Sequence, residues 1–257
     1  MKTVILAGGL GSRLAEETVR VPKPMVEIGG FPILWHIMKI YGFHGYSQFI
    51  IAAGYKGPVI KDFFDRFYAL NTDWSLSLQS GQRTIWSESV PAWDVSVFDT
   101  GLETATGGRL RRLRRWLEDG TFMATYGDGV ASIDLAALLH FHRQHGRLAT
   151  LTAVRPIARF GSIDLDGDQV AQFSEKEQGR EGWINGGFFV FEPAVLDLVA
   201  GDNVSLEHGL LARLCADGQL MAYRHEGFWH PMDTMRDRKH LEELWLAGRA
   251  PWKLWPD

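Results

Sequence analysis

The first residues that could carry out chemistry form the loop Gly8-Gly9-Leu10-Gly11-Ser12-Arg13, which follows an apolar run at residues 3–7. Glycines allow backbone N–H groups to approach an anion closely, and a helix N-terminus adds partial positive charge. The loop therefore predicts a phosphate-binding site. Its spacing differs from a GxGxxG fingerprint because position 14 is leucine, and no Gly-Lys-Ser/Thr follows as in a Walker loop. A simple glycine-rich turn is the alternative.

Two cations lie close to this loop in the sequence and suit the same role. Arg13 ends the loop, and its planar guanidinium can bind two phosphate oxygens at once, whereas the ammonium of Lys23 acts as a point charge. Pro22 and Pro24 restrict the backbone on both sides of Lys23, as expected if the ammonium must stay in one place. The alternative is a solvated lysine in a proline-rich loop.

Two aspartates have the chemistry of ligands for a hard metal ion. Asp128 lies between Gly127 and Gly129, directly after a predicted buried strand, where its carboxylate could bind Mg²⁺. Asp233 directly precedes the last predicted helix. Each residue taken alone also has a structural interpretation, as a turn aspartate at position 128 and as a helix cap or first-turn acid at position 233.

Further polar candidates occur in three short motifs. Arg109 follows two glycines in TGGRL, unlike the arginines at 111–115, which we interpret as a solvated helix face. Asn185, before Gly186 in INGGFF, could form hydrogen bonds with sugar hydroxyls, and a turn asparagine is the alternative. The pair Glu175-Lys176 in FSEKE is the third candidate.

The predicted elements place most of these side chains at one edge of a sheet. Residues 3–7 and 48–53 are short apolar runs typical of buried parallel strands, and helices are predicted over 32–45 and 59–70. The order strand, helix, strand, helix indicates an α/β fold with a mainly parallel sheet flanked by helices. Ligands bind at the carboxyl ends of the strands in such sheets, where the loop of residues 8–13 and Asp128 lie.

The remainder of the chain predicts one domain, residues 1–257, with a β-rich insertion at 74–99. In the insertion WSLSLQ, RTIWSES and WDVSVFD alternate polar and apolar residues, which is typical of strands with one solvated face. A second, less regular series of strands follows residue 148. Helices are predicted at 109–117, at 134–145 with Asp134 as cap, after Ser205, and from Thr234 to Gly248.

Composition narrows the class of protein and its partners. The chain has 257 residues, 46% of them hydrophobic, and a net charge of −4, with no basic tail that would predict a nucleic-acid partner. Cys215 is the one cysteine, which predicts a reducing cytoplasm. No apolar run approaches the roughly 20 residues of a membrane helix, so no membrane partner is expected. Ten tryptophans and an aromatic tail leave room for a homo-oligomer interface.

Taken together, the motifs resemble those of the sugar nucleotidyltransferases, also called nucleotide-sugar pyrophosphorylases. GGLGSRL followed by VPKPMVEIGG is similar to the opening signature of that family. YGDG, a glutamate-lysine pair, NGGFFVF and an aspartate before the terminal helix follow in the family's order, and AAGYKG, TGGRL and RFGSIDL extend the resemblance over nearly the whole chain. It implies a Rossmann-like, mixed but mainly parallel sheet of the nucleotide-diphospho-sugar transferase type.

The resemblance also implies a role for each candidate residue. Arg13 would bind the triphosphate, Lys23 the phosphate groups at the reacting centre, and Asp128 and Asp233 the Mg²⁺ cofactor. Glu177 stands where the family often has proline. The sugar phosphate would be bound by Glu175, Lys176, Asn185 and Gly186. The nucleotide would be bound by Leu6, Ala7, Gly8, Gly9, Leu10, Gly11, Ser12, Arg13, Lys23, Thr104, Arg109 and Gly127.

Within the family, the match predicts transfer of a cytidylyl group from CTP to α-D-glucose 1-phosphate, which gives CDP-glucose, a precursor of CDP-linked deoxysugars, and pyrophosphate. The alternatives are the same chemistry with UTP, dTTP or another sugar 1-phosphate, and a regulatory relative that binds nucleotide sugars without making them. A glycosyltransferase usually needs an Asp-x-Asp pair, where this chain has Gly127-Asp128-Gly129. An NAD-linked dehydrogenase would need a third glycine and an acid after the second strand.

Overall fold

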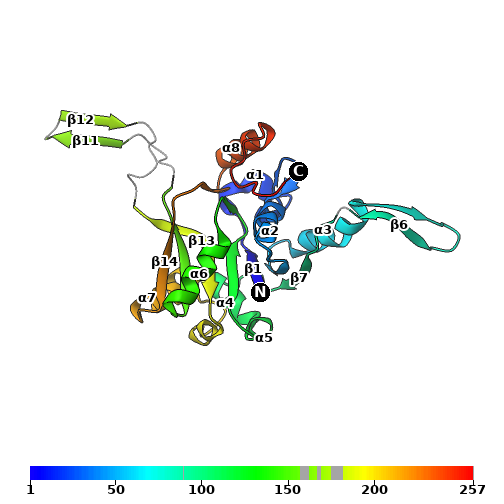
Figure 1. The fold of residues 1–257 in the computed structure, drawn as a ribbon, viewed down its shortest axis with the longest axis horizontal. Coiled ribbons are helices and arrows are strands. Elements are labelled where there is room, and N and C mark those ends of the chain that lie inside the picture. Colours follow the sequence, from blue (N-terminus) through cyan, green and yellow to red (C-terminus); the bar gives the residue numbers. More distant parts are fainter. Residues whose placement is uncertain (89, 157–161, 167–168, 175–181, 257) are drawn as a thin grey trace.

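A seven-stranded sheet forms the centre of the computed structural model, which describes residues 1–88, 90–156, 162–166, 169–174 and 182–256 (Figure 1). The strand order is β14-β10-β13-β8-β1-β4-β7. The bounds of these strands are β1 Lys2–Ala7, β4 Gln48–Ala53, β7 Asp94–Asp99, β8 Phe122–Tyr126, β10 Ala149–Val154, β13 Ile184–Phe191 and β14 Leu220–His225.

All strands of this sheet except β13 run in the same direction. β1 pairs in parallel with β4 and β8, β4 with β7, and β10 with β14, whereas β13 is antiparallel to both β8 and β10. The carboxyl ends of β1, β4 and β8 therefore meet at one edge of the sheet. The predicted mixed, mainly parallel α/β sheet is confirmed.

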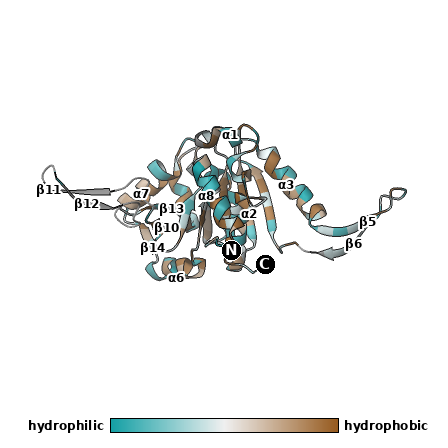
Figure 2. Ribbon diagram, turned by 90° about the horizontal axis from the view of Figure 1, so that it is seen from above, coloured by the Kyte–Doolittle hydropathy of each residue, from teal (hydrophilic) through white to brown (hydrophobic). Residues whose placement is uncertain are grey.

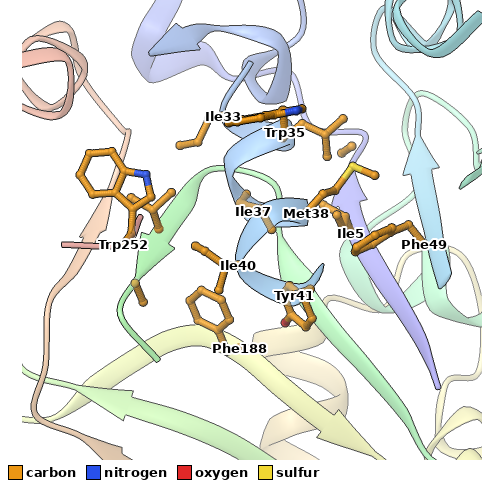
Figure 3. Close-up of a cluster of buried hydrophobic side chains, with 14 of the residues drawn as sticks. Ile5, Ile33, Trp35, Ile37, Met38, Ile40, Tyr41, Phe49, Phe188 and Trp252 are labelled. Carbon is orange, nitrogen blue, oxygen red and sulfur yellow. The ribbon is translucent and has the colours of Figure 1, made fainter. Parts of the chain in front are cut away.

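Apolar side chains fill both faces of the sheet because neighbouring residues of a strand point to opposite sides. In β1, Ile5 packs in the core that contains helix α2 (Ile33–Phe43), whereas Val4 packs in the core of the other face. Figure 3 shows Ile37, Ile40 and Tyr41 of α2 above the sheet. Burial on both faces explains why β1 and β4 read as continuous apolar runs.

Helices and helical turns cover the two faces (Figures 1 and 2). Helix α8 starts after Thr234, whose hydroxyl and the carboxylate of Asp237 form a reciprocal capping box. This helix spans Met235–Leu246. Besides α2 and α8, the α-helices in the described ranges are α1 Ala15–Thr18, α3 Gly57–Leu70, α4 Thr106–Arg112, α5 Arg114–Leu117, α6 Leu135–His145 and α7 Ala212–Ala216. The tighter or wider helical turns are η1 Ser12–Leu14, η2 Lys23–Met25, η3 Pro193–Leu198 and η4 Leu206–Leu211.

In the part of the chain that the structure describes, four pairs of short strands lie outside the main sheet. Two of them, β5–β6 and β11–β12, extend away from the body at opposite ends (Figures 1 and 2). The pair β9–β15 lies beside the site described below, and β2–β3 precedes α2. The bounds are β2 Glu27–Ile28, β3 Phe31–Pro32, β5 Thr72–Leu76, β6 Arg83–Glu88, β9 Gly129–Ala131, β11 Ser162–Asp166, β12 Gln169–Ser174 and β15 Trp229–Pro231.

The region predicted as a β-rich insertion over 74–99 is divided in the structure. β5 and β6 pair with each other as a hairpin, whereas β7 joins the main sheet through β4 and becomes its edge strand. An edge strand with one covered face shows the same alternation of polar and apolar residues as a hairpin strand, so the pattern did not distinguish the two. None of the helices in the described ranges has the length and apolarity needed to cross a bilayer.

Candidate active site

A cavity of about 320 Å³ opens at the carboxyl ends of β1 and β8. It brings together the predicted glycine loop, the cation Lys23, the strand-end residue Asp128 and four residues of the 104–109 segment. Of the predicted nucleotide-binding residues, the cavity is lined by Leu6, Ala7, Gly8, Gly9, Gly11, Ser12, Lys23, Thr104, Arg109 and Gly127. We call it the first cavity. Leu10 lies outside this lining with its side chain largely exposed, and the side chain of Arg13 lies outside the described part of the structure.

Two glycines of the loop have a specific steric role. Gly11 has a φ of 65°, in the left-handed region that favours glycine. A Cβ on Gly8 would lie 2.1 Å from Nη1 of Arg109, so no larger residue fits beside this guanidinium. The loop thus takes its shape partly from close contact with a side chain about a hundred positions away.

Arg109 is almost completely buried, with 3% of its surface exposed. Its Nη2 donates to the carbonyl of Gly8 at 3.0 Å, and its Nη1 donates to the carbonyl of Gly101 and to Oγ1 of Thr100, both at 2.7 Å. A longer bond of 3.2 Å reaches the carbonyl of Ala53 at the end of β4. Burial lowers the pKa of Arg109, partly offset by the nearby charge of Asp99. The guanidinium therefore joins the loops after β1, β4 and β7.

Lys23 lies at the centre of the polar cluster. Its Nζ donates to Oδ2 of Asp128 at 2.7 Å and to Oδ1 of Asp233 at 2.6 Å, and only 8% of the residue is exposed. Burial alone would lower the pKa of Lys23, but the two carboxylates outweigh burial and raise it. The ammonium therefore stays charged at neutral pH and is held by two ion pairs.

Main-chain contacts bring the two aspartates together. The N–H of Met232 donates to the carbonyl of Asp128 at 2.7 Å, and β9 pairs antiparallel with β15 next to this bond. The α8 cap is formed by Thr234 and Asp237, so the carboxylate of Asp233 is not the cap of that helix. The interpretation of Asp233 as an ordinary cap, which its position in the sequence allowed, is wrong.

The chemistry of this donor set suits Mg²⁺. Asp128 and Asp233 supply hard carboxylate oxygens that both reach one point, now marked by Nζ of Lys23. Within the described ranges, no group of three or more metal-ligating side chains is present. Mg²⁺ is commonly held by one or two carboxylates together with substrate phosphates and waters, so a pair of aspartates is sufficient on the protein's side.

A second cavity of about 370 Å³ adjoins the first. It is lined by Asn185 and Gly186, both predicted, and by Glu207 and Trp229, which sequence reasoning missed. Nothing in the local pattern singled out these two residues, because Glu207 lies in a helical turn and Trp229 lies in the short run Phe228-Trp229-His230. The predicted pair Glu175-Lys176 lies outside the described residues.

The two cavities share Tyr126 and Asp128. Lys23 lines the first cavity, and Asp233 lines the second. Two ligands could therefore bind side by side, with their adjoining ends at the cluster of one ammonium and two carboxylates. This arrangement suits transfer of a phosphoryl-type group between two anionic ligands, because the charged cluster lies where the ligands meet.

Comparison with known proteins identifies the family of the chain. The family model described as nucleotidyl transferase matches residues 2–232. A glucose-1-phosphate cytidylyltransferase of Salmonella typhi is 50% identical over 256 residues, which cover 99% of this chain and 100% of that protein. A probable glucose-1-phosphate cytidylyltransferase of Bacillus subtilis is 41% identical, with coverage of 99% and 100%.

Solved structures show the same fold. HddC from Yersinia pseudotuberculosis, complexed with GMP-PN, superposes with a TM-score of 0.70 at 24% identity, covering 95% of this chain and 99% of that one. A UDP-glucose pyrophosphorylase complexed with UDP-glucose gives a TM-score of 0.69 at 13% identity, with coverage of 96% and 99%. The family predicted from GGLGSRL and VPKPM is confirmed: this chain is a nucleotidyltransferase and belongs to the nucleotidyl transferase family.

Proposed function

We propose that this protein transfers a cytidylyl group from CTP to α-D-glucose 1-phosphate, giving CDP-glucose and pyrophosphate. The choice of substrates rests on the two cytidylyltransferase relatives, at 50% and 41% identity over nearly the whole chain. The observation that carries the mechanism is the meeting of two cavities at Asp128, where Lys23 contacts both aspartates.

In the proposed reaction, a phosphate oxygen of the sugar phosphate attacks the α-phosphorus of CTP in line with the leaving group. A new P–O bond forms, the bond from the α-phosphorus to the α,β-bridging oxygen breaks, and pyrophosphate leaves with that electron pair. A phosphate monoester has a second pKa of about 6, so the nucleophile is already an anion at neutral pH and needs no general base.

The main obstacle is repulsion between two polyanions, and the chain's cations reduce it. Lys23, held at the boundary of the two cavities, would bind phosphate oxygens there. Arg13, at the end of the glycine loop, would bind the triphosphate. Asp128 and Asp233 would hold Mg²⁺, which supplies further charge neutralisation to the phosphates when bound.

We assign the first cavity to the nucleotide and the second to the sugar phosphate. Gly8, Thr104 and Arg109 would shape the nucleotide side, and Asn185 and Gly186 the sugar side. For Arg109, the hydrogen bonds to loop carbonyls support a role in holding the loops that surround the nucleotide. Glu175-Lys176 remain proposed sugar-phosphate ligands from the sequence resemblance.

The experiment that tests the function is pyrophosphate release with Mg²⁺, in which CTP, UTP, GTP, ATP and dTTP are crossed with a panel of sugar 1-phosphates. Release that is strongest with CTP and glucose 1-phosphate is the expected result. Release with another pair would overturn the substrates and keep the mechanism. Nucleotide binding without release from any pair would overturn the enzymatic assignment in favour of a regulatory protein.

We further propose that the protein forms a homo-oligomer in the cytoplasm. The β5–β6 hairpin extends from the body and exposes Leu78 and Trp86, at 91% and 71% (Figure 1). A two-stranded hairpin is marginally stable by itself in water, so cover from a second copy would stabilise it. Light scattering of the wild type should give a molecular mass that is a multiple of the 29.0 kDa chain mass, and Trp86→Ser should lower the measured mass. A monomer would contradict the proposed homo-oligomer.

The proposed cytoplasmic location rests on cysteine content. The single Cys215 suits a reducing compartment.

A further inference from the structure

Hydrogen bonds link residues that line the first cavity to residues that line the second. Tyr126 lines both of them, and its hydroxyl donates to Oε1 of Glu207. Thr106 lines the first cavity, and its hydroxyl donates to Oε2 of Glu207 at 3.2 Å. Glu207 itself lines the second cavity. This side chain is therefore hydrogen-bonded to residues that line both cavities.

Three hydroxyl donors hold the Glu207 carboxylate in place. Besides Tyr126 and Thr106, Ser205 donates to Oε2 at 2.7 Å while its own oxygen caps the helical turn η4. Burial alone would raise the pKa of Glu207, but these hydrogen bonds keep it below its ordinary value, so the group is an anion at neutral pH. A carboxylate accepts about four hydrogen bonds, and among the residues that the structure describes Oε1 accepts one, from Tyr126. Acceptor capacity is therefore left for a ligand.

The other polar groups of the second cavity complement this acceptor. Oδ1 of Asn185 accepts from the N–H of Gly187 at 2.9 Å, which fixes its amide so that Nδ2 is the donor end. Nδ2 lies 3.4 Å from the Tyr126 hydroxyl. The indole N–H of Trp229 donates to the carbonyl of Gly186 at 2.7 Å, and Trp229 lines the cavity. An anionic acceptor, an amide donor and an aromatic ring suit a ligand rich in hydroxyls.

We propose that Glu207 determines specificity for the sugar by accepting a hydrogen bond from one hydroxyl of the sugar phosphate bound in the second cavity. The inference rests on the assignment of that cavity to the sugar phosphate under the proposed function. Tyr126, Ser205 and Thr106 hold the carboxylate in position for this contact. A sugar 1-phosphate that lacks the hydroxyl would leave the fixed acceptor without its donor.

The test combines substrate analogues with one variant. Steady-state kcat and KM are measured with glucose 1-phosphate and with its 2-, 3-, 4- and 6-deoxy derivatives, for the wild type and Glu207→Gln. Glu192→Gln is the matched control. Glu192 also accepts hydrogen bonds, from the hydroxyl of Thr121 at 2.8 Å and from Nε2 of His142 at 3.1 Å, but it lines neither cavity.

The wild type should lose about 10- to 100-fold in kcat/KM for one deoxy derivative, as expected for a hydrogen bond to a charged group. Glu207→Gln should lose a similar factor for glucose 1-phosphate, carried by the KM of the sugar phosphate, and should no longer discriminate against that derivative. Glu192→Gln should keep the wild-type pattern across all five substrates.

Two results would overturn the inference. One is a wild type whose kcat/KM for each of the four deoxy derivatives equals its kcat/KM for glucose 1-phosphate. This result needs no variant and so does not depend on the folding of Glu207→Gln. The other is a Glu207→Gln protein that keeps the wild-type discrimination or weakens all substrates uniformly. Asn185→Ala separates this inference from the cavity assignment: if it raises the KM of glucose 1-phosphate while Glu207→Gln shows no coupling, the cavity assignment stands and the role of Glu207 fails.

Discussion

Replacement of Lys23 by methionine tests the charged cluster directly. Methionine keeps most of the side-chain volume and removes the ammonium, so the carboxylates of Asp128 and Asp233 lose the contacts of 2.7 and 2.6 Å that hold them together. Two carboxylates that approach one point without a cation repel each other. We expect Lys23→Met to be less stable than the wild type without metal, and to be stabilised by added Mg²⁺ or Mn²⁺ more than the wild type is.

The magnitude follows from the burial of the cluster. Breaking a buried ion pair by removal of one partner costs about 3–5 kcal/mol. The side chain of Asp128 is 31% exposed and that of Asp233 is 14% exposed, so solvent screens part of the loss and we expect the lower end of this range, about 3 kcal/mol. For a chain of this size that corresponds to a decrease in Tm of roughly 6–12 °C.

The assay is thermal unfolding at neutral pH, with and without divalent cation, together with Mn²⁺ binding measured by electron paramagnetic resonance in the absence of nucleotide. The control is Lys2→Met, because Lys2 forms an exposed ion pair with Asp119 at 2.9 Å and its loss should change stability by less than about 1 kcal/mol. Turnover should also decrease by about 10²–10³ in Lys23→Met, the usual effect of losing a preorganised charge contact.

A Lys23→Met protein with wild-type Tm and no additional response to divalent cation would refute this reasoning, since it would mean that the ammonium does not balance the two carboxylates. Normal turnover in the same variant would refute the proposed role of Lys23 at the reacting phosphates. The two results are independent, because the first concerns the folded protein without substrate and the second concerns the transition state.

Three further predictions concern groups outside this cluster. Burial lowers the pKa of His36 to about 4, below its ordinary value, so the unfolded chain binds more protons than the folded chain at acid pH. The free energy of unfolding should therefore decrease by about 3 kcal/mol as the pH falls from about 6.5 to 4. Urea titrations at a series of pH values should show this decrease in the wild type and not in His36→Gln. Arg109→Lys should raise the KM of CTP about tenfold or more, because a lysine cannot make the forked bonds to the Gly8 and Gly101 carbonyls. The control is Arg111→Lys, on the exposed helix face, which should leave the KM of CTP unchanged in the same kinetic assay. Thr234→Ala should lower stability by about 1 kcal/mol through loss of the α8 cap, and a thermal melt of unchanged midpoint would contradict this.

Local pattern was sufficient for most strands of the main sheet and for most of the loops that line the first cavity. The apolar run at 48–53 is β4 with the same bounds, and the run at 3–7 is β1 except for its first residue. Glycine spacing and the prolines around Lys23 indicated segments that line the first cavity. These features are readable because burial, chain reversal and fixed φ angles each act on a few neighbouring residues.

Contacts between distant residues could not be read in the same way. The guanidinium of Arg109 proved to join the Gly8 and Gly101 carbonyls, a contact that requires three loops to meet. Glu207 and Trp229 lie in the second cavity although neither has a distinctive local motif. The alternation at 94–99 also left open whether this strand belongs to a hairpin or to the edge of the main sheet.

The sequence by itself determined the α/β class, the family and the identity of the charged residues, because motifs and periodicity are properties of short segments. Only the tertiary structure decided that Lys23 contacts both Asp128 and Asp233, and that two cavities meet beside them. The physical reason is that the carboxyl ends of parallel strands are brought together by the order of strands in the sheet and by the β9–β15 pairing. That order depends on the packing of the whole chain and not on any single stretch of it.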